Sequence, residues 1–230
     1  YEAIQAAFDA EVAAGRMKTT DSGWNGGRID FFLKSHGGNR IHVCDVDGDT
    51  SEARTHAELE GRRAMMRLLR FCRRQPGLEN FTIASMAPEC GIRETVTIKG
   101  KTEITIDDYM SGRMYDDAVC HSFYAVDIHR PDHIDFRNIE AGVYPTIPLG
   151  SLIPEGSRRL IVAGRCASGD QEANSSYRTE STCMAMGQAA GAVAALAATG
   201  PGEIEAAPLE ELRGLLRKHG AIVPGDPLGE

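Results

Sequence analysis

An apolar run that ends in a Gly-Arg turn and is followed by a helix of small residues most constrains this chain. The run and turn read Arg159-Leu-Ile-Val-Ala-Gly-Arg-Cys-Ala-Ser168, and residues 181–198 are built mainly from Ala, Gly and Met. An apolar run ending in glycine is typical of a buried strand that stops beneath a ligand. A helix that is apolar on every face is expected to be buried. The pattern predicts a strand–turn–helix unit.

The predicted helix has two features that suit a ligand or another backbone. Gly187 and Gly191 stand one turn apart and would allow close approach. Ser181 and Thr182 are expected to cap its start, where N–H groups and the positive end of the helix dipole favour an anion or a carbonyl oxygen.

Composition excludes several classes of protein. A hydrophobic content of 42% allows a real core, and a net charge of −8 argues against nucleic acid as a partner. The dense basic run at residues 62–74 is interpreted as the solvated face of a helix. Six cysteines without a Cys-x-x-Cys pair predict buried thiols in a cytoplasmic protein and no metal site. The apolar run at residues 184–198 is short for a membrane span, so no membrane partner is expected.

Hydrophobic periodicity and turn residues place the other elements. Helices are predicted over residues 1–14, 51–74, 105–111 and 208–219. Strands are predicted over residues 29–34, 40–46, 81–87, 92–98, 119–128, 143–149 and 159–164, with a Gly-Gly turn at residues 37–38. This order indicates an α/β fold with α+β character and a mixed sheet.

The strand–turn–helix unit resembles the C-terminal flavin-contacting segment of FAD-dependent oxidoreductases of the two-dinucleotide-binding-domain type. Short segments upstream resemble the same family in the same order, so that the resemblance covers roughly residues 40–200; they are Ala57–Arg63, Gly91–Thr95, Asp116–Ala118 and Asp127–His129. The resemblance implies FAD as cofactor. It assigns cofactor contacts to Gly164, Arg165, Cys166, Ala167, Thr182, Cys183, Met184, Gly187, Gln188, Ala189, Ala190 and Gly191.

The glycine-rich turn that holds the FAD pyrophosphate in such enzymes has no match here. The nearest candidates, Gly23–Gly27 and His36–Gly38, do not lie between a strand pattern and a helix pattern. We therefore expect the C-terminal part of a longer protein. Its predicted parts are a substrate-domain-like segment with a mixed sheet at residues 1–150, the last strand and helix of a Rossmann-like FAD domain at residues 151–200, and a C-terminal helix and tail at residues 201–230.

Three residues are candidates for substrate and proton handling. His129 is the first candidate for an acid–base group, ahead of His121, because imidazole titrates near neutral pH; either histidine could instead be structural. Arg93 could face the substrate or form a structural pair with Glu94. Arg178 could bind an anionic substrate or pair with Glu172 or Glu180. The other histidines, His42 among them, are expected on the surface or in loops.

Cys166 and Cys183 flank the turn–helix unit and are expected to pack rather than to form a redox pair. The resemblance implies a hydride transfer from a small organic substrate to flavin by the intact enzyme. Two alternatives stay open for the chain alone. It could be a non-catalytic remnant or interaction module, or it could be one half of a split flavoenzyme completed by a partner chain. The expected partners are a small-molecule substrate and either a second copy in a homo-oligomer or the missing N-terminal half.

Overall fold

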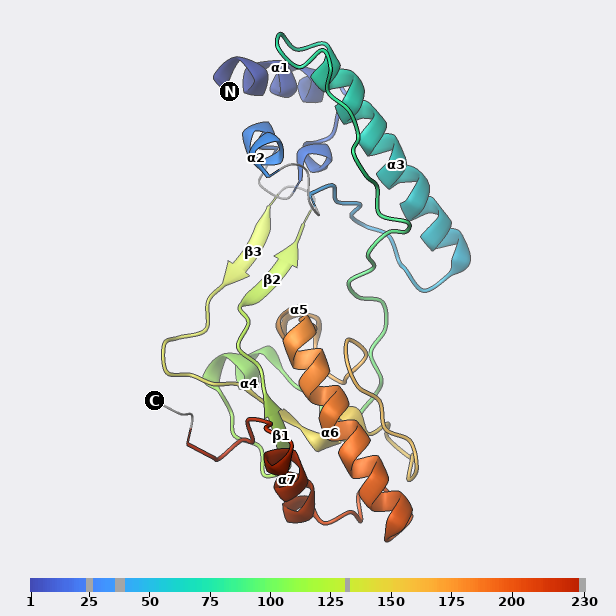
Figure 1. The fold of residues 1–230 in the computed structure, drawn as a ribbon, viewed down its shortest axis with the longest axis vertical. Coiled ribbons are helices and arrows are strands. Elements are labelled where there is room, and N and C mark those ends of the chain that lie inside the picture. The colour runs from blue at the N-terminus through green and yellow to red at the C-terminus, as the bar shows by residue number, and fades with distance from the viewer. Residues whose placement is uncertain (24–26, 36–39, 131–132, 228–230) are drawn as a thin grey trace. The chain divides into compact units, whose positions relative to one another are not determined.

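The computed structural model describes residues 1–23, 27–35, 40–130 and 133–227 (Figure 1). The chain divides into two compact units, and each unit is built from two segments of the polypeptide. Unit 1 comprises residues 1–95 and 129–135, and unit 2 comprises residues 96–128 and 136–230. The predicted division at residue 150 falls inside unit 2. Helices and small antiparallel sheets make up both units, which confirms the α/β class.

Unit 1 is mainly helical. Its elements are α1 (Glu2–Ala13), the 3-10 turn η1 (Thr19–Ser22), α2 (Ile29–Lys34) and α3 (Ser51–Arg73). Thr50 caps α3 by accepting a hydrogen bond from the Ala53 amide at 3.1 Å. One side of α3 buries Leu68 and Phe71, and the Phe71 ring meets Phe8 of α1 edge-on at 5.7 Å.

Unit 2 carries the remaining helices and all of β1 and β4. Its elements are α4 (Ile106–Ser111), β1 (Ala118–His121), β4 (Thr146–Pro148), the 3-10 turn η2 (Leu149–Leu152), α5 (Gln171–Tyr177), α6 (Glu180–Thr199) and α7 (Leu209–Lys218). Strands β2 (Val126–His129) and β3 (Ile134–Arg137) pair with each other and run across the boundary between the units. As predicted, Thr105 caps α4.

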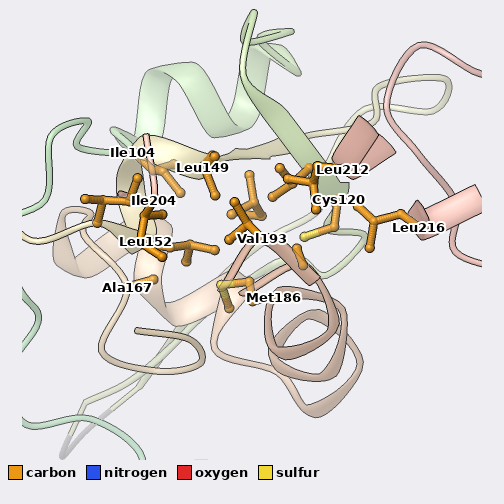
Figure 2. Packing of buried hydrophobic residues seen from close by; sticks show 14 of the residues in the cluster. Ile104, Cys120, Leu149, Leu152, Ala167, Met186, Val193, Ile204, Leu212 and Leu216 are labelled. Carbon is orange, nitrogen blue, oxygen red and sulfur yellow. The ribbon is translucent and has the colours of Figure 1, made fainter. Parts of the chain in front are cut away.

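The core of unit 2 forms where α6 packs against β1 and α7. Small side chains on α6 let its neighbours approach closely, and larger ones fill the space between them (Figure 2). The labelled core residues are Ile104, Cys120, Leu149, Leu152, Ala167, Met186, Val193, Ile204, Leu212 and Leu216. Arg213 of α7 fastens this packing, because its guanidinium donates to the carbonyls of Asp116 and Ala118.

The structure corrects several of the strand predictions. Residues 29–34 form helix α2 instead, with Asp30 in the first turn and Lys34 four residues later as its ion-pair partner. Residues 119–128 form two strands rather than one, and residues 143–149 yield only β4. The predicted mixed sheet is reduced to two-stranded pairs and isolated bridges in the described parts of the chain.

Four further runs remain outside any strand within the described ranges, although their sequences alternate or are apolar; they are residues 40–46, 81–87, 92–98 and 159–164. A strand needs a hydrogen-bonded neighbour, and these segments have few such bonds here. In the 159–164 run, the Val162 amide donates to Leu152 at 2.8 Å, and Leu160 is exposed. The Gly-Gly turn predicted at residues 37–38 lies outside the described residues.

Helix α6 differs from its prediction in its burial. Thr182, Met186, Ala189, Ala190, Val193 and Ala197 are buried. The opposite side is open, and Met184 is 69% exposed. The expectation of burial on every face is therefore wrong for this chain, because no described segment covers that side of the helix.

Candidate functional site

The turn at residues 164–167 joins the apolar run to the helical part of unit 2. The Ala167 amide donates to the Gly164 carbonyl at 3.0 Å, and Gly164 has φ +95°. Residues other than glycine rarely adopt that backbone conformation. A Cβ atom there would meet only the Cys183 Sγ, at 3.9 Å. The position therefore requires glycine for its dihedral angle, and the space beside it is open.

Hydrogen bonds to three successive carbonyls hold this turn in place. Ile98 N donates to the Cys166 carbonyl at 2.9 Å, and Asn174 Nδ2 donates to the Arg165 carbonyl at 3.0 Å. The Tyr177 hydroxyl donates to the Ala167 carbonyl at 3.0 Å. Burial raises the pKa of Tyr177, so the hydroxyl keeps its proton and its role as donor. These hydrogen bonds fix the backbone of the turn, so a ligand that contacts its outer surface would meet a rigid backbone.

The start of α6 lies next to this turn in the fold. Its N-cap is Thr179, whose side chain makes no capping hydrogen bond. The sequence expectation that Ser181 and Thr182 cap the helix is wrong, because both lie inside the first turn. Thr182 is buried, and its hydroxyl is 3.1 Å from that of Ser122. The first-turn N–H groups of α6 therefore receive no capping hydrogen bond from the N-cap side chain of Thr179.

The open side of α6 continues from this end of the helix. Gly187 and Gly191 lie on it, and an added Cβ atom at either position would meet nothing within 4 Å. Gln188 is exposed and lines, with Leu215 and His219 of α7, a hollow of about 450 Å³. The open side therefore lacks side chains at Gly187 and Gly191, whereas Met184 and Gln188 project from it.

A second cluster lies in unit 1, around His129 at the end of β2. Arg93 Nη1 is 3.2 Å from His129 Nε2, and His129 Nδ1 is 3.2 Å from His42 Nδ1. The two imidazole rings meet edge-on with centroids 4.5 Å apart. We name Arg93, His129 and His42 the imidazole cluster.

Donor chemistry fixes the tautomers in the imidazole cluster. Arginine only donates, so His129 Nε2 accepts and carries no proton. The proton of a neutral His129 is then on Nδ1 and points to His42, whose Nδ1 accepts it. A further proton could enter at His129 Nε2 only if the Arg93 guanidinium moved away.

One family comparison covers both the turn and helix α6 of unit 2 and the imidazole cluster of unit 1. A family model described as FAD dependent oxidoreductase matches residues 3–216. The chain belongs to the FAD-dependent oxidoreductase family. Its general function class is therefore redox catalysis, and members of the family use FAD. Comparison with curated proteins and with solved structures gives no match.

The FAD-dependent oxidoreductase match is wider than the roughly 40–200 inferred from motifs, and it includes the whole imidazole cluster and the turn–helix unit. The residues present fit a flavin on two observations. The first turn of α6 has no side-chain cap, and the glycines of its open side leave room for a flat ring system. Arg165 is exposed, and Met184 borders the same open side.

The cofactor residues expected from the FAD-dependent oxidoreductase resemblance divide into two groups. The members that are exposed or half-buried are Gly164, Arg165, Cys166, Cys183, Met184, Gly187, Gln188 and Gly191. Side chains that are buried in the core are those of Ala167, Thr182, Ala189 and Ala190. The buried members can shape a flavin site by packing but cannot touch a ligand on the open side.

The two thiols of this family segment are both hydrogen-bond donors. Cys183 Sγ donates to the Arg178 carbonyl at 3.2 Å, and Cys166 Sγ donates to the Ala163 carbonyl at 3.7 Å. Burial raises the pKa of the Cys183 thiol, which opposes the thiolate that redox exchange requires. Both observations favour packing.

Arg178 lies in unit 2, whereas Arg93 and His129 lie in unit 1. The Arg178 guanidinium donates to the carbonyls of Asp127 at 3.1 Å and Ser175 at 3.3 Å. Glu172, one of its expected partners, pairs with Arg137. The contacts of Arg178 described here are therefore those of a residue that fixes β2 against α5.

Sequence reasoning missed His42, which it placed on the surface or in a loop. His42 is half-buried and belongs to the imidazole cluster. It lies 87 residues from His129 in a run that forms no strand, so no local pattern pointed to it.

Two further features concern metal ligands and membrane-spanning helices among the described residues. No group of three or more His, Cys, Asp or Glu side chains is arranged to hold a metal ion there. Helix α6 is long and apolar enough to cross a membrane by length and composition, a test that core helices of soluble proteins also pass.

Proposed function

We propose that this chain forms part of an enzyme that transfers a hydride from a small organic substrate to FAD. The observation that carries the proposal is the surface formed by the 164–167 turn and the open side of α6, in a chain of the FAD-dependent oxidoreductase family. Backbone donors and the open positions at Gly187 and Gly191 suit a planar cofactor whose ring carbonyls need hydrogen bonds.

The chain's residues would hold the cofactor in two ways. N–H groups at the uncapped start of α6 would donate to carbonyl oxygens of the ring system. Gly187 and Gly191 would let the flat ring approach the helix backbone, and the exposed Arg165 would favour negative charge. When bound, the flavin supplies the hydride acceptor.

The imidazole cluster is the proposed site of substrate and proton handling. Loss of a hydride from an alcohol or amine carbon leaves a proton that a base must accept. His129 Nε2 is the atom that can accept it, since His42 fixes the other ring nitrogen as a donor. Arg93, which now occupies Nε2, would turn toward the substrate and present its guanidinium there.

Replacing His129 tests this role. In the flavin-loaded protein, His129→Ala should slow reduction of the flavin by substrate by about 100-fold or more while the flavin stays bound, because a general base contributes roughly that factor. His56→Ala is the matched control, since His56 is exposed on α3 of the same unit. Rates of flavin reduction that are equal in the two variants would remove His129 from the mechanism.

One observation favours a second candidate, a flavoenzyme completed by another polypeptide. The open side of α6 exposes Met184, Gly187 and Gly191. Small apolar residues on an exposed helix face suit contact with another backbone. Gel filtration of the chain alone and with the product of the neighbouring gene tests this candidate. A shift to one larger, flavin-containing species supports completion by a partner, and a monomer that ignores the second protein contradicts it.

A further inference from the structure

A buried histidine of unit 2 has polar atoms that the fold leaves unused. His121 ends β1 and is 7% exposed, and neither ring nitrogen has a hydrogen-bond partner in the described part of the chain. Thr146, its partner in the β1–β4 register, is already engaged. The Thr146 hydroxyl donates to the Arg113 carbonyl at 2.8 Å and accepts from the Tyr115 amide at 3.4 Å.

Two exposed aromatic rings lie against this histidine. The His121 ring is 5.6 Å from the Phe123 ring and 6.5 Å from the Tyr144 ring, centroid to centroid. Phe123 and Tyr144 also meet each other at 5.9 Å, although they are 56% and 44% exposed. We name His121, Phe123 and Tyr144 the aromatic triplet.

Two features of the aromatic triplet are unfavourable: the buried imidazole has no hydrogen-bond partner among the described residues, and two aromatic rings beside it are exposed. A neutral imidazole carries one donor and one acceptor, and leaving both without partners away from water destabilises the fold. Exposed aromatic rings likewise lose the free energy that burial would provide. A ligand that covers the two rings and reaches the imidazole would relieve both costs.

We propose that the aromatic triplet binds a neutral, planar aromatic molecule that carries a carboxamide or hydroxyl group. The flat ring would stack on or meet the edges of Phe123 and Tyr144, the arrangements that aromatic pairs prefer. A carboxamide or hydroxyl both donates and accepts, so it can pair with either nitrogen of His121 in either tautomer.

Access to the imidazole requires the outer rings to turn. The nitrogen atoms of His121 are covered in this structure, and the exposed rings of Phe123 and Tyr144 adjoin them. Side-chain rotamer changes at binding surfaces are common, and exposed rings reorient rapidly.

The inference does not rest on flavin binding, because none of the three residues of the aromatic triplet is among those proposed to hold the cofactor. It is tested on the full chain without added cofactor. The chain is labelled with 13C at histidine Cε1 and titrated with benzamide, and the His121 signal is assigned by its loss in His121→Phe. Cyclohexanecarboxamide, which has the same amide on a ring that is not flat, is the ligand control.

Benzamide should shift the His121 signal to saturation and should bind about tenfold more tightly than cyclohexanecarboxamide, the worth of a favourable aromatic contact. Phe123→Leu should weaken benzamide by a similar factor. Phe136→Leu, which removes a comparably exposed ring from β3, should leave it unchanged. Phe123→Leu lies at an exposed position and carries the test even where His121→Phe does not fold.

Four results would overturn the inference, three of them seen in the amide titrations alone. Those three are a His121 signal that does not move, equal affinity for the two amides, and an affinity for benzamide that Phe123→Leu leaves unaltered. Displacement of benzamide by FAD would also overturn it, since the triplet would then belong to the cofactor site. Failure of the flavin proposal would show instead as a chain that binds benzamide but not FAD.

Discussion

Two glycines on the proposed flavin side are there for different physical reasons. Gly164 has φ +95°, which only glycine adopts without strain, and its surroundings are nearly empty. Gly187 lies within α6, where an added Cβ atom would meet nothing. Space is therefore not the reason for either glycine within this chain. The first serves the backbone conformation, and the second keeps the helix surface flat.

Matched alanine variants separate these reasons. Gly164→Ala should lower the free energy of unfolding by about 1–3 kcal/mol, because alanine is strained at that dihedral angle. Gly187→Ala should raise it by up to about 1 kcal/mol, because alanine favours the helix. Urea unfolding followed by circular dichroism measures both. A stability change of the same sign in the two variants would contradict this account of the glycines.

At the scale of elements, α3 is fixed to η1 by an ionic network. Arg67 of α3 donates two hydrogen bonds to Asp21, which is 1% exposed, and one to Glu60. Lys18 also donates to Glu60, at 2.9 Å. Hydrogen bonds from Lys18 and Arg67 lower the pKa of Glu60 to about 2 from its ordinary 4.5. The basic stretch of α3 is thus not only the solvated face that its sequence predicts.

This network gives unit 1 an acid dependence with a defined sign. The pKa of Glu60 is lower in the folded chain than in the unfolded chain, so its contribution is complete above pH 4.5 and is lost as pH falls toward about 2. Glu60→Gln should remove on the order of 1 kcal/mol of stability at neutral pH and flatten the decline below pH 4.5.

Urea unfolding at a series of pH values measures that slope. Glu2→Gln, at an exposed position in the first turn of α1, is the control and should keep the wild-type slope. An unchanged slope in Glu60→Gln would show that other carboxyl groups cause the acid dependence.

Helices were predictable from this sequence, whereas short strands were not. Helices α1, α3, α6 and α7 follow from periodicity and caps within one segment. The run at residues 29–34 is apolar and short, and only its partners decide its conformation. Gln5 of α1 accepts from the Ile29 amide, and Asp30 is flanked by Arg28 and Lys34. Those contacts select helix α2. Only the Asp30–Lys34 pair has the i,i+4 spacing of a helix, so hydrophobic periodicity does not reveal the other two contacts.

At the scale of the whole molecule, the candidate site was predictable only in part. His129 and Arg93 were found from the family motifs and lie 3.2 Å apart. His42 and His121 matter through contacts made by the tertiary fold, and neither has a local motif. Helix α6 lies where the sequence predicts it, whereas helix α5 occupies what reads as a polar loop between the turn and α6. The open side of α6 was not foreseen, because a sequence does not state which faces its neighbours cover.

The division into two units places the proposed functions in different parts of the chain. The imidazole cluster belongs to unit 1, whereas the cofactor surface and the aromatic triplet belong to unit 2. Each can therefore be altered by substitutions that leave the core of the other unit untouched. Flavin binding can therefore be measured as a property of unit 2, without a substrate at the imidazole cluster.

The most direct measurement is the visible absorbance spectrum of the purified chain, before and after addition of FAD, with mass analysis of what denaturation releases. The account predicts the perturbed spectrum of a bound flavin, and predicts that Gly187→Phe abolishes it because a ring would then occupy the open side of α6. A colourless chain that leaves the spectrum of added FAD unchanged would contradict the proposed cofactor surface.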